Sequence, residues 1–167
     1  LLQLAEALEE MIKVQRLINE ETQKLDKRRG EWRRADRRRC IELAEKQDNL
    51  ATEGEKLVKM MEKEKAVVYP GRLRSAVHDM KEVVELLESY DTGGYTQSVQ
   101  YEILKVLEEL AKSLRREYQA KKRQRPGRPR QGGGGGKKPP LVPPVAELKM
   151  LRNMEKEVYT RTTRLYE

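Results

Sequence analysis

The first 64 residues contain no proline, and their apolar residues recur at the three- and four-residue spacing of a helix that buries one stripe. This spacing is typical of a coiled-coil seam. The pattern predicts one uninterrupted helix from Leu1 to Glu64, about 96 Å long at ~1.5 Å per residue. The seam begins with Leu1, Leu4, Leu8, Met11, Ile18, Leu25 and Trp32.

The composition favours helices with one buried stripe over a globule with a thick core. Of the 167 residues, 37% are hydrophobic and 38% are charged, and there is no Phe. Disorder is the alternative for so polar a chain, but disordered segments lack the apolar periodicity seen here. We therefore expect an all-α protein.

Three more helical segments follow in the sequence. Pro70 fits the first turn of a helix that runs to about Ser89, and residues 91–94 form a stop and turn. Thr96 is the expected N-cap of the next helix. Pro144 can begin a last helix, whose heptad seam is Val145, Leu148, Leu151, Glu155, Val158, Thr162 and Leu165.

These patterns divide the chain into four regions. Residues 1–40 are expected to project as a coiled-coil stalk, and residues 41–120 to form an antiparallel helical bundle from the end of the first helix and a helical hairpin. Residues 121–144, with five consecutive glycines, are expected to be a disordered basic Gly/Pro linker. Residues 145–167 are expected to dock on the bundle or on the stalk.

An internal repeat of 32 residues relates two parts of the first helix. If it is more than chance recurrence of seam chemistry, it marks equivalent layers that each contain a buried glutamine. A core amide needs a hydrogen-bond partner, so it fixes register at some loss of stability. The repeat matches Met11, Gln15, Ile18, Thr22 and Leu25 with Leu43, Gln47, Leu50, Gly54 and Leu57.

The apolar seam of the stalk has to be buried against something. We expect a protein partner, most simply the same stalk of a second copy, which predicts a homo-oligomer. The competing arrangement lays the last helix along the stalk. The expected partner contacts are Leu4, Leu8, Met11, Ile18, Leu25 and Trp32.

The net charge of +8 comes from one basic segment, Lys121 to Lys138, which contains no acidic residue. A soluble tether is the first interpretation, and salt-dependent contact with nucleic acid or another anionic polymer is the alternative. Residues 127–130 resemble an AT-hook core, with Pro126 in place of its first arginine. The expected polyanion contacts are Lys121, Lys122, Arg123, Arg125, Arg128 and Arg130.

The sequence nominates no catalytic, cofactor-binding or metal-binding residue. Cys40 and His78 are the only residues of their kinds, and we expect a buried apolar filler and a surface histidine. Nothing predicts a concave site or an oxyanion hole, so we expect no enzyme and no cofactor. No stretch reaches the ~18 apolar residues of a transmembrane segment. The chain begins at Leu1 and not at Met, so we expect a fragment or a processed product.

The closing stretch Leu141–Arg152, the motif Gln15-x2-Ile18-x3-Thr22-x2-Leu25 and the Thr96-Gln97 helix start together resemble long-helical envelope proteins of planctomycete-type bacteria. The resemblance implies long helices, a low-complexity linker and a place in the bacterial cell envelope or periplasm; a cytoplasmic location is the alternative. That family has no assigned activity, so the resemblance transfers no functional residue.

Together these features predict a non-enzymatic structural or interaction protein. It would act as a helical scaffold or spacer through its coiled-coil seams, with the bacterial envelope as its expected location. The alternative is nucleic-acid or other polyanion binding through the basic linker.

Overall fold

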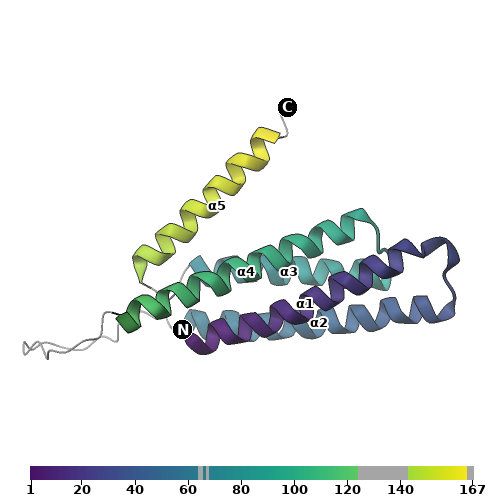
Figure 1. Ribbon diagram of the computed structural model, residues 1–167, viewed down its shortest axis with the longest axis horizontal. Coiled ribbons are helices and arrows are strands. Elements are labelled where there is room, and N and C mark those ends of the chain that lie inside the picture. The colour runs from purple at the N-terminus through teal and green to yellow at the C-terminus, as the bar shows by residue number, and fades with distance from the viewer. Residues whose placement is uncertain (64–65, 67, 124–142, 165–167) are drawn as a thin grey trace, which may run out of the picture.

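The computed structural model describes residues 1–63, 66, 68–123 and 143–164, and the regular structure in these ranges is entirely helical. The expected all-α bundle is confirmed. The described ranges contain five α-helices and a short 3₁₀ turn at Arg29–Glu31 (Figure 1). The helices are α1 (Leu2–Lys27), α2 (Arg34–Lys63), α3 (Val68–Glu88), α4 (Gly94–Arg123) and α5 (Pro144–Arg164).

Helices α1 to α4 form an antiparallel four-helix bundle, in which α2 and α4 each pack against both α1 and α3. The α1–α2 and α3–α4 connections lie at the same end of the bundle, on the right in Figure 1. Helix α5 runs over the opposite half of the bundle, and its C-terminal end points away from it.

The prediction of one uninterrupted helix from Leu1 to Glu64 is wrong. Helix α1 ends at Lys27, and the chain reverses before α2 begins at Arg34. The Trp32 indole N–H closes this reversal, since it donates a hydrogen bond of 2.8 Å to the Leu25 carbonyl near the end of α1. The Asp36 carboxylate then accepts from the Arg33 backbone N–H at 2.9 Å, which satisfies a donor at the start of α2.

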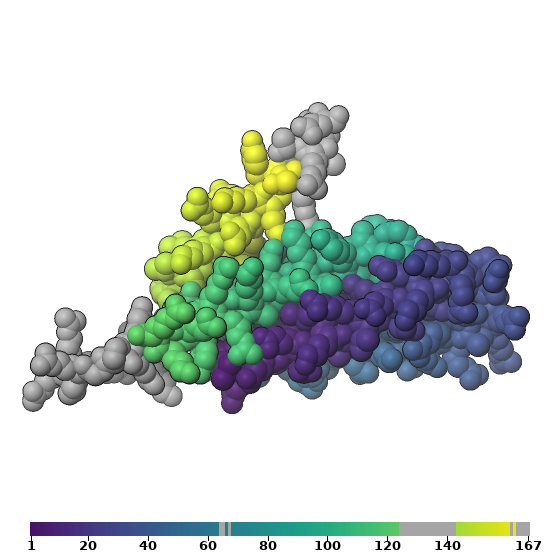
Figure 2. All heavy atoms as spheres, in the orientation of Figure 1, coloured from purple at the N-terminus to yellow at the C-terminus, as the bar shows by residue number. Residues whose placement is uncertain are grey.

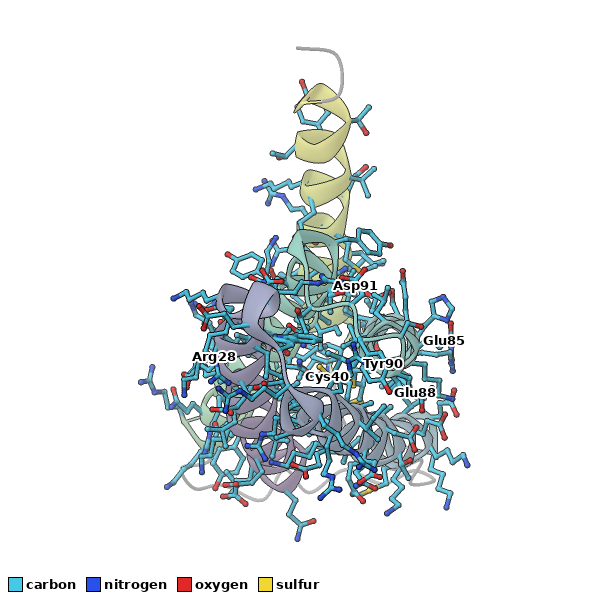
Figure 3. The ribbon with its side chains drawn as sticks, turned by 90° about the vertical axis from the view of Figure 1, so that its right-hand side faces the viewer. Arg28, Cys40, Glu85, Glu88, Tyr90 and Asp91 are labelled. Carbon is cyan, nitrogen blue, oxygen red and sulfur yellow. The ribbon has the colours of Figure 1, made fainter. Side chains whose placement is uncertain are left out.

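The other connection, at the same end of the bundle, is equally well defined. The Asp91 and Tyr90 backbone N–H groups donate to the carbonyls of Leu86 and Leu87 at 2.8 and 3.0 Å, which is the Schellman pattern that ends a helix. Tyr90 holds the left-handed position of this motif, with φ 60°. Figure 3 looks onto this end and shows Tyr90 and Asp91 beside the α1–α2 connection.

The six residues expected to contact a partner chain lie in the core or against it, which corrects that prediction. Their seam is covered by α2 and α4 of the same chain. Residues 1–40 are therefore part of the bundle and its connection, and no stalk with an open seam projects from the described chain. Trp32 is half-buried against the core, and the other five are at most 5% exposed: Leu4, Leu8, Met11, Ile18 and Leu25.

Several smaller predictions can also be compared with the structure. Helix α5 begins at Pro144 as predicted, Cys40 is buried, and His78 is exposed. Thr96 is not an N-cap, because α4 already begins at Gly94. The Thr96 hydroxyl is instead buried within the first turns of α4 and donates to the Asp91 carbonyl at 3.0 Å.

The internal repeat brings two glutamines together in the core. Gln15 on α1 and Gln47 on α2 are both fully buried, and their amides exchange two hydrogen bonds, of 3.0 and 2.8 Å. A second polar layer joins α4 to α1, where the Gln100 amide donates to the Thr22 hydroxyl at 2.9 Å. The prediction of buried, partnered glutamines is confirmed for Gln15 and Gln47, but the two lie in one layer and not in two separate ones. The Gln100 amide oxygen is buried without a hydrogen-bond partner among the described residues.

We predict that Gln15→Leu destabilises the bundle more than the double change Gln15→Leu with Gln47→Leu. The single variant leaves the Gln47 amide buried without its main partner, which costs about 1–3 kcal/mol. The double variant replaces both polar groups by apolar ones of similar shape, so its free energy of unfolding should return close to the parent value. Urea unfolding followed by circular dichroism measures the parent, the single variants Gln15→Leu and Gln47→Leu, and the double variant. Simple additivity of the two single changes would contradict the pairing.

Candidate functional site

Helix α5 is the helix of the described chain whose apolar residues are least used by the fold. One of its faces carries Ala146 and Met150, which are buried, and Met154, which is half-buried against the core. Near the same end, the Glu147 carboxylate accepts from the Val68 backbone N–H at 3.2 Å, at the start of α3. These few contacts hold the first half of α5 to the bundle.

A cluster of charges holds the second half. Arg72 on α3 donates to the Glu157 carboxylate on α5 at 2.6 Å and to Glu109 on α4 at 3.4 Å. Lys105, also on α4, pairs with the other Glu157 oxygen at 3.0 Å. The Arg72 and Glu157 side chains are mostly buried, so water screens their interaction less than it screens a surface pair. Three helices thus share one ionic contact.

The two carboxylates of this cluster titrate in opposite directions from their usual value of 4.5. Burial raises the pKa of Glu109, and the negative charge of Glu157 raises it further. For Glu157, burial also acts to raise the pKa, but the hydrogen bond from Lys105 and the positive charge of Arg72 outweigh it, so the pKa is lowered.

The face of α5 that points away from the bundle is the more apolar one. Leu148 is 63% exposed and Val158 is 64% exposed, and Val145 and Leu151 are exposed as well. Leu148, Leu151 and Val158 occupy the heptad positions predicted for the last helix, and we call these three residues the outer stripe. A helix that docks by alanine and methionine while leaving leucine and valine in water has a second face suited to a partner.

A cationic cleft lies between α4 and α5. It consists of two adjoining cavities, and Arg116 on α4 and Lys156 on α5 line both of them. Lys112 on α4 lines the cavity of about 290 Å³, and Lys149 on α5 lines the cavity of about 330 Å³. Figure 2 shows α5, in yellow-green and yellow, standing over the green surface of α4. All four side chains are exposed, and none of them forms an ion pair or hydrogen bond with another described residue.

The polyanion contacts predicted from the sequence are only partly described. Lys121, Lys122 and Arg123 are exposed in the last turn of α4. Arg125, Arg128 and Arg130, like most of the predicted linker, lie outside the described residues. The four cations of the cleft were not among the residues predicted from the sequence. The available signal was their spacing, four residues apart on α4 and seven on α5, which puts each pair on one helix face.

Other kinds of site find little support in the part of the chain that the structure describes. Within it, no three or more His, Cys, Asp and Glu side chains are grouped so as to hold a metal ion. Burial raises the pKa of the Cys40 thiol, which keeps it in its less reactive protonated form. No described helix is both long and apolar enough to span a bilayer. Comparisons with protein-family models, curated proteins and solved structures gave no significant match.

We predict that α5 docks most tightly in a pH window that includes 4.5 and more loosely on either side. Above the raised pKa of Glu109, that carboxylate ionises beside Glu157 and repels it. Below the lowered pKa of Glu157, protonation removes the charge that Arg72 and Lys105 pair with, so the stability that this pairing contributes is lost as pH falls. The methyl NMR signals of Met150 and Met154, followed from neutral to strongly acidic pH, report the docking.

Two variants test separately the loss of docking at high pH and the loss of docking at low pH. Glu109→Gln should keep α5 docked at neutral pH, because it removes the repelling charge. Glu157→Gln should abolish the loss of docking in acid and weaken docking at all higher pH. Methyl signals that do not respond to pH in the parent would contradict the role of the cluster.

Proposed function

We propose that this protein is a non-enzymatic helical scaffold that associates with a partner helix through the outer stripe of α5. The observation that carries the proposal is that Leu148, Leu151 and Val158 are exposed on a helix already docked by its other face. The bundle helices, by contrast, bury their own seams against one another. We therefore assign the partner contact, which the sequence predicted for the first helix, to the last helix.

The spacing of the outer stripe suits helix pairing. Leu148, Leu151, Glu155, Val158 and Thr162 follow alternating three- and four-residue steps, as the core positions of a coiled coil do. Helix α5 has 21 residues, which is three heptads and about 31 Å at ~1.5 Å per residue. Burying the exposed leucines and valine would contribute roughly 25 cal/mol for each Å² of apolar surface removed from water.

Two charges in this face point to a second copy as the partner. Neither Arg152 nor Glu155 has an ion-pair partner among the described residues. In an antiparallel pair of α5 helices, heptad geometry puts Leu148 opposite the partner's Val158 and Arg152 next to the partner's Glu155. Each copy then supplies the charge that the other lacks, which an unrelated partner has no reason to do.

In this arrangement two bundles are held apart by a pair of α5 helices, which makes the protein a spacer. The envelope location that the sequence resemblance implies fits a spacer and stays a prediction. The partner contacts named at the sequence level, on the first helix, are not part of this proposal because they are buried.

We predict that Leu148→Asp with Val158→Asp converts a dimeric parent to a monomer. The two carboxylates would have to be buried in the helix pair without partners, which is costly enough to abolish a contact of this size. Sedimentation equilibrium across a range of concentrations measures the association. Leu17→Asp on α1 is the matched control, since Leu17 is 62% exposed and Leu148 is 63% exposed. A parent that is monomeric at all concentrations, or a dimer that survives the double change, would refute the proposal.

A further inference from the structure

The cationic cleft between α4 and α5 is not explained by the contacts that hold the fold together. Lys112 and Arg116 lie four residues apart on one face of α4. Lys149 and Lys156 lie seven residues apart on one face of α5. These two like-charged rows line two adjoining cavities that share Arg116 and Lys156, although opposite charges would hold the two helices together better.

The carboxylates of the cleft do not neutralise these rows. Glu109 and Glu157 also line it, but Arg72 and Lys105 already pair with them. Glu117 is the one further acidic residue along the cavity, and Arg152, which lies between the cleft and the outer stripe, adds another cation. The cleft therefore keeps an excess of positive charge, which opposes the docking of α5 until an anion enters.

We propose that this cleft binds the phosphodiester backbone of a single-stranded nucleic acid, without sequence selection. The row from Lys149 to Lys156 is about 10 Å long at ~1.5 Å per residue. That is the length of about three phosphates at ~3.4 Å of axis per phosphate in one strand. The row from Lys112 to Arg116 is shorter, about 6 Å by the same rise. The four cations of the two rows can contact about four phosphates of a strand that runs between them.

The shape of the site favours a single strand over other polyanions. A cavity of about 290 Å³ between two helices is concave, so the flat surface of a bilayer cannot reach both of its walls. A duplex is wider than such a cavity and would contact the rim alone. Lysine and arginine ammonium and guanidinium groups bind phosphate oxygens directly, so the backbone is sufficient for recognition.

Binding in the cleft also strengthens the contact between α5 and the bundle. The strand contacts both helices only while α5 is docked, so it stabilises the docked state by mass action. Amides of α5 should therefore exchange with solvent more slowly when the strand is bound. This effect distinguishes the cleft from the basic segment at residues 121–138, which need not order α5.

The test measures the affinity of the full chain for a fluorescent twenty-nucleotide thymidine strand by anisotropy at several salt concentrations. For four phosphate contacts the logarithm of the association constant should fall with the logarithm of salt with a slope of about −2.8. The triple change Lys112→Gln, Lys149→Gln and Lys156→Gln should reduce this slope by about 2 and weaken binding roughly 100-fold at ~0.1 M salt. In this variant, adding the strand should no longer slow the exchange of α5 amide hydrogens with solvent.

A matched variant changes three exposed lysines on α2, Lys46, Lys59 and Lys63, to glutamine. It removes the same charge from another face and should keep most of the affinity. Arg125→Gln with Arg128→Gln and Arg130→Gln tests the contribution of the basic segment. A uridine strand of the same length should bind comparably, since the backbone is the recognised group.

Four results would overturn the inference. The first is that the parent does not bind the strand, and the second is that the α2 variant loses as much affinity as the cleft variant. The third is that the segment variant loses affinity while the cleft variant binds normally. The fourth is that the parent binds phosphatidylserine vesicles or poly-glutamate more tightly than the strand. Circular dichroism of the cleft variant confirms that it stays folded, as expected for exposed lysines.

Discussion

The paired amides of Gln15 and Gln47 are the contact on which the arrangement of this bundle depends. Leucine seams pack in several registers at similar cost, because apolar contact has no direction. Two buried amides satisfy each other in one register only, since sliding α1 along α2 by one turn would leave both unpaired in the core. The pair also requires the two halves of the repeat to face each other. One long helix could not bring these two residues into contact.

The reversal between α1 and α2 decides what is left for a partner. Once the chain folds back, α2 and α4 cover the seam of α1, so that seam is not available to a second chain. The apolar surface that we propose pairs with a partner is on α5 instead, which has two apolar faces and only one of them covered. The same physics that favoured a pairing stalk therefore favours a pairing last helix.

The helical periodicity, the Pro144 start and the 32-residue repeat predicted most of this fold, because each is a local signal. The reversal was not predicted, because the apolar pattern continues through it: a seam that pairs with a second chain and one that pairs with the next helix have the same spacing. The local evidence was weak, namely Gly30 and an eleven-residue step from Trp32 to Leu43. The cleft could not be predicted, because Lys112 and Lys156 come to line one cavity only through the docking of α5.

The inner face, the outer stripe and the cleft side of α5 make different contacts. The contact of the inner face with the bundle is the one that determines how easily the other two can bind. The inner face rests on an alanine, two methionines and one shared ionic cluster, which is a small contact for a helix of this length. When two copies pair through the outer stripe, each α5 has to be fixed on its bundle. The conformational entropy that α5 loses then reduces the free energy of association. An anion in the cleft lies on another face and orders α5 beforehand, so it would lower this cost without touching the stripe. Strand binding and pairing would then be positively coupled, and by linkage each would strengthen the other by the same factor.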